Sequence, residues 1–223
     1  RVKANTTYGQ SIVSYTGNAT AGATVGHGLS SAPEMIILKD RDGTTNWNVY
    51  HASNTSAPET EALALNTTDA TSDYLWWNDT APTSSVFSLG AISNTNANGN
   101  NFIAYLWHSV TGYSKIGSYI GTGSSGLAIT GLGFKPAFLI VKNTTSAVAW
   151  RLSDAVREPN NPRTTLLFPD DTTGDTSDSS YSHTYDSDGF TINNTHSGFN
   201  TNGDTYIYMA FADTREYAYW LDQ

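Results

Sequence analysis

The chain has 223 residues, of which 38% are hydrophobic and 14% charged, and its formal net charge at pH 7 is −9. Disordered chains combine low hydrophobicity with high net charge, and nucleic-acid-binding proteins need a basic face, so both classes are excluded. The absence of cysteine excludes disulfides and cysteine-ligated metal sites. No apolar run reaches the roughly 18 residues of a membrane span, so we expect no membrane insertion.

The first half of the chain predicts short strands separated by turns. The apolar run at 35–38 is typical of a strand that is buried on both faces. A turn at 40–43 then leads to a second strand that contains Trp47, which is the spacing of a hairpin. The alternation of larger apolar residues with other residues is strongest in the last strand. The expected strands are 12–16, 23–25, 35–38, 46–50, 63–65, 86–89 and 102–107.

The second half repeats these elements in the same order. Gly28 falls on Gly131 and Trp47 on Trp150, and further matches keep this spacing within a residue. The corresponding strands are 116–120, 127–129, 137–141, 148–152, 166–168, 190–192 and 206–211. We therefore expect an all-β chain of two tandem β-sandwich, jelly-roll-like domains related by internal duplication, with boundaries 1–112 and 113–223.

Two acidic segments resemble the start of a calcium loop, in which carboxylates at alternate positions precede a glycine. They are Asp40-Arg41-Asp42-Gly43 and Asp186-Ser187-Asp188-Gly189. Both lack the distal glutamate, and they occupy different places in the two repeats, so Asp-Gly turns are the preferred interpretation. We expect no metal and no cofactor.

Catalytic motifs are absent from the sequence. There is no G-x-S-x-G elbow, and nothing pairs two carboxylates as glycoside hydrolysis requires. No histidine has a counterpart in the other repeat. We predict that the chain is not an enzyme and has no catalytic residues.

Aromatic residues are the stronger indication of binding. Trp47 and Trp150 repeat at equivalent positions, which predicts core packing for both. Trp76 and Trp77 lie instead in a polar loop beside Asn78 and Asp79, and sugars stack on exposed rings while amides and carboxylates bind their hydroxyls. The same loop of the second repeat offers Tyr181, His183 and Tyr185. These seven residues form the predicted ligand-binding set.

Core packing is the alternative for the tryptophan pair, with one ring capping the end of the sandwich or filling the seam between the domains. A further aromatic segment, Tyr217-Ala218-Tyr219-Trp220, follows the last repeated strand. It predicts a surface that packs against a subunit or a neighbouring domain.

Several of these segments resemble β-rich modules of phage tail-fibre and virion structural proteins, of the marine and cyanophage type, whose function is uncharacterised. The resemblance rests on a G-L-x-x-x-P-x-x-[IL]-[IL] block that occurs twice, and on three longer phrases. The two copies of the block begin at Gly28 and Gly131. The three longer phrases are Asn46-Trp47-Asn48-Val49-Tyr50, 77–87 and 206–212. The resemblance implies a location on the virion surface, outside the cell, and supplies no catalytic residues.

Three hypotheses follow. The first is a virion-surface or tail-fibre component that contributes to host attachment by binding a host-surface glycan. The second is a structural capsid decoration or fibre spacer that acts through assembly interfaces, and the third is a polysaccharide-degrading enzyme. The expected partners are other virion proteins and further copies of the chain, with a trimer typical of fibres, and nucleic acid is not among them.

Overall fold

The computed structural model describes residues 1–213, and the aromatic segment at 217–220 lies outside them. The chain divides into two compact units, the first spanning Arg1–His108 and the second beginning at Ser109. Ser109 Oγ accepts a hydrogen bond from Ile116 N at 3.0 Å, which ties the start of the second unit to its first strand. The boundary predicted from the sequence lies after residue 112.

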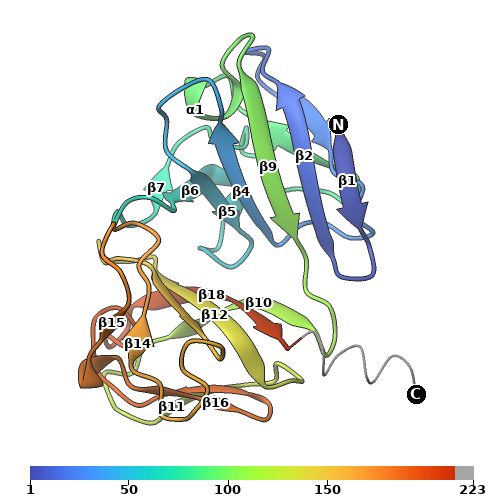
Figure 1. The fold of residues 1–223 in the computed structure, drawn as a ribbon. Coiled ribbons are helices and arrows are strands. Elements are labelled where there is room, and N and C mark those ends of the chain that lie inside the picture. The colour runs from blue at the N-terminus through green and yellow to red at the C-terminus, as the bar shows by residue number, and fades with distance from the viewer. Residues whose placement is uncertain (214–223) are drawn as a thin grey trace. The chain divides into compact units, whose positions relative to one another are not determined.

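The first unit is built from a long antiparallel sheet and a two-stranded one. The long sheet has the order β1-β2-β9-β4-β5-β6-β7, and β3 pairs with β8. Figure 1 shows β9 between β2 and β4, although both of these strands lie far from β9 in the sequence. The elements are β1 (Val2–Asn5), β2 (Gln10–Thr16), β3 (Ala23–Gly26), β4 (Met35–Asp40), β5 (Asn48–His51), η1 (Pro58–Thr60), β6 (Glu61–Ala64), β7 (Ser72–Asp73), β8 (Val86–Leu89), α1 (Ser93–Asn96) and β9 (Asn101–Trp107).

The core of the first unit lies between the long sheet and the β3–β8 pair. Ile36 and Leu38 of β4 contribute to it from one side, and Phe87 and Leu89 of β8 from the other. The alternating strand β9 turns Phe102 and every second residue after it into this core, where they are buried. All four residues of 35–38 are buried, as the apolar run predicted.

The second unit repeats the central strand order. Its four-stranded sheet has the order β10-β18-β12-β13, which matches β2-β9-β4-β5, and smaller sheets are formed by β11-β17-β16 and by β14-β15. The elements are β10 (Ser114–Ile120), β11 (Leu127–Thr130), β12 (Pro136–Asn143), β13 (Arg151–Asp154), β14 (Thr165–Leu166), β15 (Thr176–Ser177), η2 (Ser179–Tyr181), β16 (His183–Asp186), β17 (Gly189–Ile192) and β18 (Thr205–Ala212).

Equivalent rings pack with the same geometry in the two units. Tyr15 stacks on Phe102 with ring centroids 5.1 Å apart, and Tyr119 stacks on Tyr206 at 5.0 Å. Both tyrosine hydroxyls donate to a backbone carbonyl eighty residues further along the chain. The predicted all-β class is confirmed, while a common origin of the two units stays a prediction from the sequence.

The two repeated tryptophans differ in burial. Trp150 is buried, as predicted, whereas Trp47 is only partly buried. None of the helices that the structure describes has the length and apolar character needed to cross a bilayer.

Candidate functional site

A small cavity of about 140 Å³ lies beside Trp76 in the first unit. β6 forms one wall, and the polar residues Asn46, Asn48, Asp69 and Ser72 line the remainder. We call it the Trp76 cavity. It brings one aromatic residue together with two amides, a hydroxyl and a carboxylate.

Hydrogen bonds fix two walls of this cavity. Asn48 is only 2% exposed, and its Nδ2 donates to Asn94 O at 3.0 Å and to Asn46 O at 3.3 Å. The indole Nε1 of Trp76 donates to Ser72 O at 3.1 Å. Because both side chains are already held in place, a ligand would not have to order them.

A glycine fixes the backbone that carries Trp76. The carbonyl of Trp76 accepts hydrogen bonds from Gly90 N at 3.1 Å and from Thr95 Oγ1 at 3.2 Å. A Cβ atom at Gly90 would lie 1.7 Å from Leu75 O, which is far inside contact distance. Only glycine therefore lets the chain between β8 and α1 approach this segment so closely.

Trp77 does not share the environment of its neighbour. It is 1% exposed, its Nε1 donates to Glu61 O at 2.9 Å, and its ring meets Tyr50 edge-on in the core. Trp76 lines the cavity and Trp77 does not. The predicted pair of ligand-binding tryptophans is thus reduced to one, and the core-packing alternative holds for Trp77.

Asn78 and Asp79 form a turn. Both have positive φ, 57° and 47°, and Thr80 N donates to Trp77 O at 3.3 Å across them. Two successive positive φ values define a type I′ turn, which favours Asn, Asp and Gly. This conformation accounts for both residue types, and neither residue lines the Trp76 cavity.

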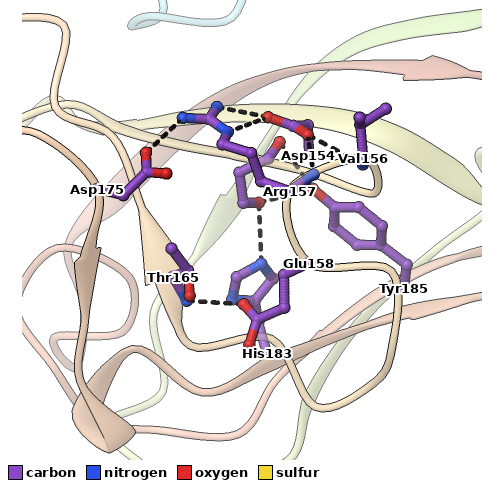
Figure 2. A network of polar contacts seen from close by, with 9 residues as sticks. Asp154, Val156, Arg157, Glu158, Thr165, Asp175, His183 and Tyr185 are labelled. Atoms are coloured by element: carbon purple, nitrogen blue, oxygen red, sulfur yellow. Dashed lines mark hydrogen bonds and ion pairs between the residues drawn. The ribbon is translucent and has the colours of Figure 1, made fainter.

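The three residues predicted in the second unit do not form an exposed aromatic loop. His183 and Tyr185 belong to β16 and are 0% and 1% exposed, because both side chains point inward from the same strand. Figure 2 shows them in one polar network, and their common partner is Ser153 of β13. Tyr181 is only partly buried, and it joins this network through its backbone carbonyl rather than through its ring.

Hydrogen bonds engage both imidazole nitrogens of His183 and the hydroxyls of Ser153 and Tyr185. His183 Nε2 lies 2.9 Å from Ser153 Oγ, and Tyr185 OH lies 2.6 Å from the same oxygen. His183 Nδ1 lies 2.9 Å from Tyr181 O. Burial lowers the pKa of the His183 imidazole and raises the pKa of the Tyr185 hydroxyl, so both are uncharged at neutral pH.

A serine hydroxyl within hydrogen-bond distance of an imidazole is the geometry of an activated nucleophile. Here Ser153 is 4% exposed and Phe199 stacks on the His183 ring, so a substrate has no access to the hydroxyl. The arrangement joins β13 to β16 within the core. Sequence reasoning missed Ser153, because its partners lie some thirty residues away and nothing local distinguishes it.

Charged residues surround this network. Arg157 forms salt bridges with Asp154 and with Asp175, the latter at 2.9 Å (Figure 2). The guanidinium of Arg163 lies over the Tyr185 ring, 4.0 Å from its centroid, and hydrogen-bonds to Asn161. These contacts fix the loop between β13 and β14 against β16.

In both calcium-like segments an aspartate accepts hydrogen bonds from backbone N–H groups, within its own turn for Asp40 and across to another loop for Asp188. Asp40 Oδ1 accepts from Asp42 N at 2.9 Å and from Gly43 N at 3.1 Å. The N–H groups of Gly133 and Gly131 bond to Asp188 and lower the pKa of that carboxyl. Within residues 1–213, no group of three His, Asp or Glu side chains is placed to hold a metal ion.

One family model matches the chain. It describes a domain of unknown function, DUF7483, and it covers residues 1–215, which include both units. Comparison with curated proteins gave no match, and comparison with solved structures gave none either.

Proposed function

Since the chain belongs to the DUF7483 family, whose function is unknown, we propose a function from its site: a non-enzymatic component of a phage virion surface or tail fibre that contributes to host attachment. In this proposal the Trp76 cavity holds part of a host-surface glycan. Other virion proteins and further copies of the chain are the remaining partners.

The composition of the Trp76 cavity carries the proposal. Sugar rings offer apolar faces, which stack on indole, and hydroxyls, which bond to amides and carboxylates. Trp76, Asn46, Asn48 and Asp69 supply these groups around one cavity. The resemblance of the sequence to phage fibre and virion modules supports the location outside the cell.

The number of carboxylates in the Trp76 cavity favours glycan binding over glycan hydrolysis. Glycoside hydrolysis uses two carboxyl groups on either side of the scissile bond. Asp69 is the one carboxylate among the residues that line the Trp76 cavity. The formal charge of −9 gives no support to a nucleic-acid partner.

An array of bacterial surface oligosaccharides tests the proposal, probed with the full chain and two variants. Trp76→Ala removes the aromatic wall, and Asp79→Asn changes an exposed residue that does not line the cavity. We expect wild type and Asp79→Asn to bind the same glycans and Trp76→Ala to bind none. Equal binding by all three proteins would exclude the cavity as the site.

A structural role in the virion is the second candidate, and one observation favours it. Tyr74 and Leu75 are 57% and 52% exposed immediately before Trp76, and exposed apolar residues that adjoin one another mark interfaces. If no glycan binds, and replacing Tyr74 and Leu75 by serine changes the oligomeric state in sedimentation, the assembly role replaces the binding role.

A further inference from the structure

Arg151 is a buried cation of the second unit. The residue is 6% exposed, and its guanidinium lies between two aromatic rings, 4.7 Å from the centroid of Phe168 and 5.5 Å from that of Tyr181. Aromatic rings stabilise a cation through their faces but satisfy none of its N–H groups. The rings therefore orient the guanidinium without satisfying its donors.

Those donors lack partners. Nε and Nη1 of Arg151 are buried and form no hydrogen bond, and no salt bridge to Arg151 exists within residues 1–213. Asp170 is close enough to act on the charge of Arg151, yet its Oδ1 accepts from Trp150 N at 3.1 Å. A buried charge without a counterion is destabilising. A bound anion would pair with the guanidinium and relieve this cost.

A glycine and a histidine complete the surroundings. A Cβ atom at Gly198 would lie 2.5 Å from Arg151 Nε, so the guanidinium packs directly on the backbone there. The His196 ring meets Tyr181 edge-on at 5.1 Å. His196 Nδ1 accepts from Gly198 N at 2.9 Å, which leaves Nε2 as the imidazole nitrogen that no described residue engages.

Arg151 occupies the position that Asn48 has in the first unit. Asn48 lies opposite Leu38 in the β4–β5 pair, and Arg151 lies opposite Val141 in the β12–β13 pair. Each then reaches the segment that precedes the last strand of its unit: Asn48 bonds to Asn94 O in α1, and Arg151 packs against Gly198. The same place in the sandwich therefore holds a neutral amide in one unit and a cation in the other.

We propose that Arg151, Phe168, Tyr181 and His196, here called the Arg151 cluster, form a second binding site that takes the carboxylate of an acidic sugar. The identification of the ligand as a sugar rests on the proposed function. The inference that the cluster binds an anion does not depend on it. A monoanion fits better than a phosphate dianion because the cluster has one permanent cation, and the negative charges of Asp170 and Asp178 already act on Arg151 and His196. The planar guanidinium matches the two oxygens of a carboxylate.

Calorimetric titration of the full chain with sodium glucuronate, glucose and inorganic phosphate tests the assignment. Glucuronate is expected to bind, glucose not to bind at this site, and phosphate to bind at least tenfold more weakly than glucuronate. Arg151→Gln should weaken glucuronate binding at least tenfold, and Lys135→Gln, which removes an equal charge at an exposed position, should not. Equal affinity for phosphate would overturn the carboxylate assignment, and failure of glucuronate to bind wild type would overturn the site.

Two further variants separate this site from folding effects and from the Trp76 cavity. His196→Ala leaves the buried guanidinium in place and should still weaken glucuronate binding, so an unchanged affinity would remove His196 from the site. Trp76→Ala should bind glucuronate as wild type does. If Trp76→Ala loses glucuronate and Arg151→Gln keeps it, the carboxylate belongs to the Trp76 cavity and the Arg151 cluster is not a site.

Discussion

Asp40 and Asn100 are joined by a hydrogen bond in which Asn100 Nδ2 donates to Asp40 Oδ2 at 2.8 Å. Their counterparts in the second unit, Asn143 and Asp204, form the same bond at 2.8 Å with the acid and the amide exchanged. In both units the residue at the end of the long central strand also closes the following turn through its Oδ1. The pairing of one acid with one amide is therefore kept while the residues change places.

This exchange predicts a compensating double mutant. Asn100→Asp should lower the free energy of unfolding at neutral pH by about 1–3 kcal/mol, because it places two carboxylates within hydrogen-bond distance. Adding Asp40→Asn recreates the arrangement of the second unit and should recover most of the loss. Urea denaturation of the two single variants and the double variant measures the coupling, and strictly additive effects would contradict it.

Gly90 predicts a localised effect on the Trp76 segment. Gly90→Ala should destabilise the first unit by about 1–3 kcal/mol, since its Cβ would meet Leu75 O at 1.7 Å and the neighbouring backbone must shift. Gly26→Ala is the control, because the nearest atom to its Cβ would be 3.8 Å away. The melting temperature of Gly90→Ala should be well below that of Gly26→Ala. Equal melting temperatures would refute the close approach of Gly90 to Leu75 O.

The two adjacent tryptophans should separate stability from binding. Trp77→Ala removes a buried ring from the core and should cost about 3–5 kcal/mol of unfolding free energy. Trp76→Ala should cost less, because its ring is only partly buried, and should abolish glycan binding. Chemical denaturation together with the oligosaccharide array measures both effects. A Trp76→Ala protein that is the less stable of the two would place Trp76 in the core instead.

Buried histidine makes the second unit sensitive to acid. Burial lowers the pKa of His183 from its ordinary value near 6.5, so the unfolded chain takes up a proton that the folded chain does not. This contribution to stability is complete above pH 6.5 and is lost as the pH falls through the lowered pKa. One such group can change the unfolding free energy by at most about 1.4 kcal/mol per pH unit.

His183→Gln should therefore reduce the dependence of stability on pH, whatever it does to stability itself. Urea denaturation at about pH 7.5 and about pH 5 gives the two slopes. Wild type should lose more unfolding free energy on acidification than the variant. An identical pH dependence would mean that His183 is protonated equally in the folded and unfolded chains.

Hydrophobic alternation and turn chemistry were sufficient to predict most of the strands that build the cores. The apolar run at 35–38 lies in β4, and the alternating residues at 102–107 lie in β9, as predicted. The short edge strands β7 and β15 were not predicted, because two residues of Ser, Asp or Thr carry no periodic signal. β16 was missed for a related reason, since its His, Thr, Tyr and Asp residues are typical of a loop.

The candidate sites were harder to predict than the fold. The sequence identified Trp76, but it grouped it with Trp77, Asn78 and Asp79, whose positions follow from a core contact and a turn. Arg151 was overlooked because an arginine on a strand normally faces water. Its alignment with Asn48 was the available signal, because a cation replacing an amide at a core-facing position needs a partner.

The most direct test of the Trp76 cavity follows the indole N–H resonances of the full chain by NMR. The strongest oligosaccharide from the array is titrated in, and the Trp76 and Trp77 signals are assigned with Trp76→Phe and Trp77→Phe variants. The account predicts that the Trp76 signal shifts in proportion to bound ligand while the Trp77 signal, from a ring in the core, moves little. A ligand that binds without shifting the Trp76 signal would contradict the account.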